Sequence, residues 1–106
     1  MILSQRGLIS RYKMKAIRAD EVKRFEDIPN VGKRMADDFR QLGIKNPADL
    51  KKKKAITLYR KMCVIAGRQD PCVLDTYMAA VDFMNGASAK PWWAYTKERK
   101  RQYPNI

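Results

Sequence analysis

The stretch from residue 71 to residue 84 constrains the fold more than any other part of the sequence. It consists of the residues PCVLDTYMAAVDFM, which are apolar on nearly every side of a helix and include no lysine or arginine. Asp70 can cap the start of such a helix, Pro71 suits its first position, and Gly86 can end it. Because a helix that is apolar all round must be covered by other elements, the sequence predicts a helical bundle with this segment at its centre.

The remaining segments are typical of the shorter helices that cover a central one. Apolar residues recur at helical spacing on one side of each longer segment, and caps or prolines mark the starts, such as Thr96 before the last one. The predicted helices span residues 20–28, 33–42, 47–52, 55–66 and 97–102, in addition to the central one. No alternating strand pattern occurs. The predicted fold is therefore all-α, a compact bundle of five to six short helices.

A tight turn is predicted between the first two of these helices. Pro29 disfavours helical geometry in the residue before it, and both Asn30 and Gly32 tolerate unusual backbone angles. The second helix is expected to end at Gly43, a good residue for the position after a helix, with Ile44 making the accompanying apolar contact. A looser helix–turn–helix is predicted around residues 67–71, which raises the possibility of a degenerate tandem pair.

The chain carries a large excess of positive charge. It has 23 basic and 11 acidic residues among 106, for a net charge of +12. A field of that size attracts polyanions, of which nucleic acid is our first expectation and an anionic membrane surface the second; a charge serving only solubility is the third. No apolar run reaches the roughly 18 residues that a membrane span needs. We therefore expect a soluble, cytoplasmic protein without a membrane partner.

The start of the second predicted helix is where a phosphate would bind. The first N–H groups of a helix lack partners within it, and the helix dipole adds positive charge there. Small residues in the preceding turn let a phosphate approach the backbone. We therefore predict that Asn30, Val31 and Gly32 supply N–H groups, and that Lys33 and Arg34 add full charges. Phosphate contacts of this kind do not depend on the base sequence.

Four consecutive lysines are a second candidate for phosphate contact. Lys51, Lys52, Lys53 and Lys54 follow a short predicted helix. A run of this kind is usually a solvated face. If it lies on the same side as the turn, it would extend the phosphate footprint to a second strand.

The N-terminal segment, residues 1–19, is basic and contains no acidic residue. We expect it to be a mobile arm, with the folded domain covering residues 20–106. Two alternatives stay open, namely that the native chain starts at Met14 and that the segment is a transit peptide.

Enzymatic chemistry is not expected. The chain has no histidine, which removes the commonest general base and metal ligand. Cys63 and Cys72 are nine positions apart and do not form a metal-binding pattern, so we interpret both as small buried apolar groups. Cys72 lies near a predicted helix start, where a thiolate is favoured, but no base accompanies it. We therefore expect no cofactor and no bound metal.

Two further pairs have a functional and a structural interpretation. The adjacent carboxylates of Asp37 and Asp38 would point to different sides of a helix, so we interpret them as solvated acids, with Asp37 balancing a nearby base such as Lys33. Trp92 and Trp93 either pack over the bundle as a lid, which we favour, or stack on the bases of a single strand.

The sequence FEDIPNVGKRMADDFRQLGI, residues 25–44, resembles the helix-hairpin-helix motif. The matching positions are Ile28, Pro29, Val31, Gly32, Ala36, Phe39, Leu42, Gly43 and Ile44. Asn30 stands where the motif has its first glycine. Asparagine accepts left-handed backbone angles, so the turn can form. Its side chain would either crowd a phosphate or donate a hydrogen bond to it.

The resemblance extends over about residues 20–101. The strings that carry it are IPNVGKRMADDFRQLGI, NPADL, LYRKMC, GRQDPCVLDTYMAAVDFMNG and KPWWAYTKERK. Together they are similar to a small bacterial family usually labelled pathogenicity locus helix-hairpin-helix proteins, some members of which are called mitomycin-resistance-like. The resemblance implies a helix-hairpin-helix fold and favours Met14 as the start of the chain.

Two functions follow as predictions. The first is non-enzymatic, sequence-independent binding of nucleic acid, most simply double-stranded DNA, through the hairpin. Because one hairpin with its flanking lysines would neutralise only about 3–5 phosphates, a homodimer or a protein partner would strengthen binding. The second is a protein–protein interaction module in which the hairpin is structural and the basic surface docks on an acidic protein.

Overall fold

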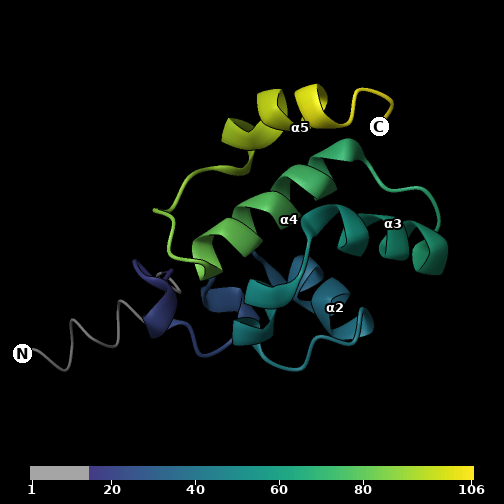
Figure 1. Ribbon diagram of the computed structural model, residues 1–106. Helices are drawn as coiled ribbons and strands as arrows, with labels where there is room; N and C mark the ends of the chain where they lie inside the picture. Colours follow the sequence, from purple (N-terminus) through teal and green to yellow (C-terminus); the bar gives the residue numbers. More distant parts are fainter. Residues whose placement is uncertain (1–14) are drawn as a thin grey trace, which may run out of the picture.

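The computed structural model describes residues 15–106, where every regular element is a helix (Figure 1). The α-helices are α2 (Lys33–Gln41), α3 (Ala55–Ala66), α4 (Pro71–Met84) and α5 (Thr96–Gln102). The 3-10 helices are η1 (Ala19–Glu21), η2 (Phe25–Asp27), η3 (Pro47–Lys52) and η4 (Trp92–Tyr95). No strand occurs in residues 15–106, so the all-α prediction is confirmed. None of the described helices is long and apolar enough to cross a membrane.

Helix α4 lies at the centre, as its all-round apolar sequence predicts. In Figure 1 it separates α5 from α2 and α3. Leu74, Tyr77 and Ala80 of this helix have no exposed surface. The Asp70 carboxylate accepts a hydrogen bond from the N–H of Cys72 at 2.9 Å, which satisfies one of the free donors at the helix start. The predicted cap and the predicted position are therefore both confirmed.

An aromatic chain links the centre of the bundle to the predicted hairpin. The ring centroid of Phe39, on α2, lies 5.2 Å from that of Tyr77 and 5.5 Å from that of Phe25 in η2. All three side chains are buried. These contacts position the turn between η2 and α2 against α4.

The segment before the turn is not the α-helix predicted for residues 20–28. Two separate 3-10 helices occur there, and Val22 between them has an extended backbone. The physical reason is local hydrogen bonding by carboxylates. Glu21 accepts from two backbone N–H groups that precede η1, and Asp27 does the same before η2. Such side-chain bonds compete with a continuous helix and close each segment after one turn.

The end of α2 has the geometry predicted for it. Gly43 has a φ of 84°, and its N–H donates to the Arg40 carbonyl at 3.0 Å. The N–H of Ile44 donates to the Phe39 carbonyl at 3.1 Å, and the Ile44 side chain is buried. This pair of bonds is a Schellman motif, so the predicted stop at Gly43 is confirmed.

The connection between α3 and α4 is built differently from the first turn. Gly67, with a φ of 85°, ends α3, and Asp70 caps α4 three residues later. The hydroxyl of Tyr59 donates to the carbonyl of the buried Gln69 at 2.6 Å and holds this loop against α3. A degenerate tandem pair of hairpins therefore stays a prediction.

A buried ion pair fixes α5 on α4. Asp75 has no exposed surface, and the Arg99 side chain is 8 % exposed. Arg99 Nε donates to Asp75 Oδ1 at 2.9 Å, and the Thr96 hydroxyl donates to Asp75 Oδ2 at 2.7 Å. The prediction that Thr96 caps the last helix is therefore wrong, because its hydroxyl is used by this carboxylate and α5 already includes Thr96.

The predicted N-terminal arm lies mostly outside the described residues, as does Met14, its alternative start. Of residues 1–19, the structure describes 15–19, which contact the domain. The N–H of Ala16 donates to the Asp27 carbonyl at 2.8 Å. The Lys15 ammonium donates to the carbonyl oxygens of Glu26 and Val31, at the two sides of the turn.

Candidate nucleic-acid interface

The predicted turn between η2 and α2 is present. The N–H of Val31 donates to the Ile28 carbonyl at 3.0 Å, and Asn30 has a φ of 72°. Proline followed by a residue with positive φ is typical of a type II turn. Asn30 is the only non-glycine residue with positive φ among those described. The Val31 N–H, one of the predicted phosphate donors, is already paired within this turn, and the Val31 side chain is buried.

Helix α2 begins directly after the turn with its first donors free. The first hydrogen bond within the helix joins the Ala36 N–H to the Gly32 carbonyl at 2.9 Å, so the N–H groups of Lys33, Arg34 and Met35 have no partner inside the helix. Gly32, Lys33 and Arg34 are all exposed. Three predicted site residues therefore surround one exposed helix start.

Gly32 has no structural need to be glycine. Its φ is −92°, which any residue adopts, and a Cβ added there would meet nothing within 4 Å. Among the described residues, no atom therefore fills the space beside Gly32, the residue directly before the free N–H groups of α2. Neither the backbone angle nor the packing requires a glycine at this position. A ligand that approaches the backbone closely would require one.

The charged side chains of α2 divide into paired and unpaired groups. Lys33 Nζ lies 3.4 Å from Asp37 Oδ2, as predicted for charge balance, and Arg40 pairs with Asp37 at 3.0 Å and with Glu26 at 3.2 Å. Among the residues described, Arg34 forms no salt bridge. Ion pairs of this kind at the protein surface contribute little to stability.

Asp38 does not behave as the solvated acid that was predicted. Its carboxylate is half-buried and accepts a hydrogen bond from the Tyr77 hydroxyl at 3.4 Å. Burial raises the pKa of Asp38, and the bond from Tyr77 only partly offsets this. Asp38 therefore lies on the core side of α2, while the adjacent Asp37 faces solvent and pairs with the side chains of Lys33 and Arg40.

The Asn30 side chain is hydrogen-bonded to the segment that precedes α5. Its Nδ2 donates to the Lys90 carbonyl at 2.7 Å, and its Oδ1 accepts from the Trp92 N–H at 3.2 Å. Both polar atoms are therefore used by a segment 60 residues away in sequence. The expectation that this side chain either crowds a phosphate or donates to it stays a prediction.

The Lys90–Trp93 segment consequently lies against the turn. Trp92 is half-buried, whereas Trp93 is 64 % exposed. The two indole rings meet edge to face, with centroids 5.6 Å apart and an angle of 85°. The prediction that the tryptophans pack over the bundle as a lid therefore fits Trp92 and does not fit Trp93.

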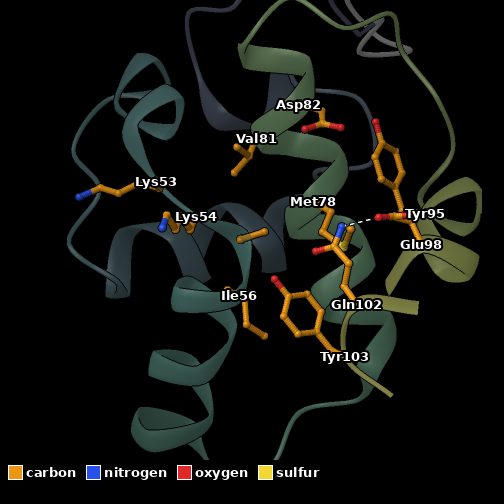
Figure 2. Close-up of a pocket in the computed structure, with 11 residues that line it drawn as sticks. Lys53, Lys54, Ile56, Met78, Val81, Asp82, Tyr95, Glu98, Gln102 and Tyr103 are labelled. Atoms are coloured by element: carbon orange, nitrogen blue, oxygen red, sulfur yellow. Dashed lines mark hydrogen bonds between the residues drawn. The ribbon is translucent and has the colours of Figure 1, made fainter. Parts of the chain in front are cut away.

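The four lysines are all exposed, but two of them border a separate hollow. Lys51 and Lys52 end η3, and Lys53 and Lys54 connect it to α3. Lys53 and Lys54 line a hollow of about 440 Å³ between the start of α3, α4 and α5 (Figure 2). No residue of the turn or of α2 lines it. In Figure 2 the Lys53 side chain extends away from the other lining groups.

The acidic groups of this hollow are already engaged. Burial and the neighbouring Asp82 raise the pKa of Tyr95 to about 12, so its hydroxyl stays protonated beside that carboxylate. Hydrogen bonds from Arg101 and Gln102 lower the pKa of Glu98 to about 2. The lysines at the rim are therefore left without an acidic partner within the hollow.

The two cysteines are not part of a metal site within the described residues. Cys63 and Cys72 are free and half-buried. Burial, together with the neighbouring Asp70, raises the pKa of Cys72, which keeps the thiol protonated at neutral pH. In the part of the chain from residue 15 onward, no group of three or more cysteine, aspartate or glutamate residues could hold a metal ion.

The Asp27 carboxylate that shapes the approach to the turn gives a pH-dependent prediction. Burial alone would raise its pKa, but hydrogen bonds from the N–H groups of Arg24 and Lys23 lower it more. Its stabilisation is therefore present above the ordinary aspartate pKa of about 4 and is lost as the pH falls through the lower folded value. We expect Asp27→Asn to cost about 1 kcal/mol at pH 6 and less at pH 3 in urea unfolding. A cost of equal size at both pH values would contradict this role.

Comparison with known proteins places the chain in a family. Residues 18–101 match the protein family described as Pathogenicity locus. The chain is 48% identical over 73 residues to the mitomycin resistance protein McrB of Streptomyces lavendulae, a match that covers 68% of this chain and 70% of that protein. No solved structure matches it. With nearly all of the described domain inside the match, the chain belongs to the Pathogenicity locus family.

Proposed function

We propose that this protein is a non-enzymatic nucleic-acid-binding protein that holds the phosphate backbone of double-stranded DNA at the start of α2. The observation that carries the proposal is the open helix start. Gly32 is exposed, needs no glycine for its conformation or packing, and precedes three N–H groups without partners in the helix. Lys33 and Arg34 flank it with full charges.

The chemistry of this start fits a phosphate. Free backbone N–H groups, the positive end of a helix dipole and two cationic side chains all favour an anion, and none of them reads a base. The unit would work as a helix-hairpin-helix in which the first helix is replaced by the 3-10 helix η2. The type II turn and the Schellman stop of α2 give the hairpin its shape with one α-helix instead of two.

The charge of the whole chain supports the same ligand. The net charge of +12 raises the local concentration of any polyanion and makes binding depend on salt. Contact with about 3–5 phosphates gives a slope of log affinity against log salt near −3 to −4.5. Affinity should then fall roughly a hundredfold between 50 and 200 mM salt.

The test is fluorescence anisotropy with a labelled duplex at these two salt concentrations, comparing wild type with Gly32→Glu. We expect wild type to show the steep slope and the variant to lose about tenfold or more at 50 mM, because a carboxylate in front of the N–H groups repels phosphate. Gly32→Ala adds volume without charge and should lose less. Circular dichroism checks that each variant is folded.

Two outcomes would overturn the proposal. If wild type binds no DNA at 50 mM salt, the basic surface serves another partner, and the protein interaction module becomes the better account. If Gly32→Glu binds as tightly as wild type, the phosphate contact lies elsewhere, with the lysines at the end of η3 as the next region to test.

A further inference from the structure

We infer that the exposed ring of Trp93 is a stacking platform for an unpaired base beside the phosphate contact, so that the preferred ligand is duplex DNA with a single-stranded gap. This inference rests on the proposed function and specifies its ligand. It is carried by the placement of the Lys90–Trp93 segment, which the Asn30 side chain holds against the turn.

The platform is fixed at the turn by two hydrogen bonds. The Asn30 side chain binds a carbonyl before Pro91 and an N–H after it, at 2.7 and 3.2 Å. Asn30 is three residues from Lys33 in sequence, and Trp93 directly follows Trp92. The hydrogen bonds of Asn30 therefore join two short segments. One leads into the start of α2, and the other leads into the exposed indole of Trp93.

The Trp93 ring is also presented in a defined orientation. The half-buried Trp92 meets it edge to face at 5.6 Å, which orients the ring while leaving 64 % of the residue exposed. A large aromatic side chain that is exposed yet held in place loses little conformational freedom when a base stacks on it. The conformational entropy of the Trp93 side chain is therefore already lost when the protein folds, and not when a base binds.

The surrounding charge favours a base of nucleic acid over an apolar protein segment. Lys90 is exposed, and so are Lys33 and Arg34, which follow Asn30 by three and four residues. A phosphate bound at α2 would bring its strand to this point. In an intact duplex the bases are stacked inside, so a free base face is available only where the strand is unpaired.

The experiment compares two labelled DNAs of equal length, an intact duplex and a duplex with a central gap of several nucleotides. Anisotropy gives the affinity for each DNA, and the two affinities are compared as a ratio. Phosphate contacts that both DNAs make do not change this ratio. We expect wild type to favour the gapped DNA by about tenfold and Trp93→Ala to abolish this preference. Trp93→Phe should retain part of it. The matched control is Val64→Ala, which shortens an apolar residue that is 85 % exposed on α3 and should not change the ratio.

A second variant tests the tether. Asn30→Gly keeps the positive φ of the turn but removes both hydrogen bonds to the Lys90–Trp92 segment, so it should reduce the preference as Trp93→Ala does. Thermal unfolding confirms that both variants fold. Quenching of tryptophan fluorescence by gapped DNA, lost in Trp93→Ala, is the spectroscopic counterpart.

The outcomes separate this inference from the proposed function. Salt-dependent duplex binding without any preference for the gap overturns the platform alone. Loss of affinity for both DNAs by the same factor in Trp93→Ala also overturns it, because the ring would then serve the common contact. Absence of all DNA binding at 50 mM salt overturns both proposals, and a dimer that depends on Trp93 would assign the ring to a protein contact instead.

Discussion

Replacement of Asp75 with alanine is expected to lower the free energy of unfolding by about 3–5 kcal/mol, because it leaves the buried Arg99 guanidinium without its partner. The two groups lie 2.9 Å apart, Asp75 has no exposed surface, and the Arg99 side chain is 8 % exposed. The Thr96 hydroxyl loses its acceptor as well. Urea unfolding followed by circular dichroism measures the change, and a loss below about 1 kcal/mol would show that water reaches the cationic group.

The matched control is an exposed ion pair on the same helix. Arg101 pairs with Glu98 at the surface of α5. Glu98→Gln removes this pair and should change stability far less than Asp75→Ala does, since exposed pairs contribute little. The double variant Asp75→Leu, Arg99→Met replaces the buried pair with apolar groups and should recover much of the stability lost in Asp75→Ala.

Reversing the charges of Lys33 and Arg34 is expected to have the largest effect on DNA binding. The double variant Lys33→Glu, Arg34→Glu places two carboxylates beside the free N–H groups of α2. We expect affinity for duplex DNA at 50 mM salt to fall by more than about tenfold, and the salt slope to flatten by about 2, because each cation lost removes one phosphate contact.

The control for this variant carries the same change of net charge elsewhere. Lys97 and Lys100 are exposed on α5, which lies on the other side of α4 from α2 (Figure 1). The variant Lys97→Glu, Lys100→Glu should weaken binding only through the general field of the protein. Equal losses in the two double variants would mean that net charge alone attracts DNA and that α2 is not the contact.

Local signals in the sequence determined most of the helix positions. Helix α4 was predicted from Pro71 to Met84 and α3 from Ala55 to Ala66, the bounds that they have in the structure. Proline, asparagine and glycine act through their own backbone preferences, and caps act within one helical turn. For the same reason the turn at Pro29 and Asn30 and the stop of α2 at Gly43 were predictable.

The first segment shows where local signals compete. Val22 and Phe25 have helical spacing, which predicted a helix, but Glu21 and Asp27 each bind backbone N–H groups just before them. Both patterns are local, and the sequence alone does not weigh a weak apolar periodicity against two carboxylates that close 3-10 turns. Phe25 of that stripe is buried in the core, whereas Val22 is half-buried against it.

The sequence by itself determined an all-α fold, its central helix and the exposed basic start of α2, because these depend on residues close together in the chain. Tertiary structure alone decided that Asp75 meets Arg99, 24 residues away, and that Asn30 holds the segment around Trp92, some 60 residues away. Such pairs form because packing around α4 brings residues that are distant in the sequence into contact. The physical reason is that a hydrogen bond or an ion pair needs contact, and contact between distant residues is set by packing.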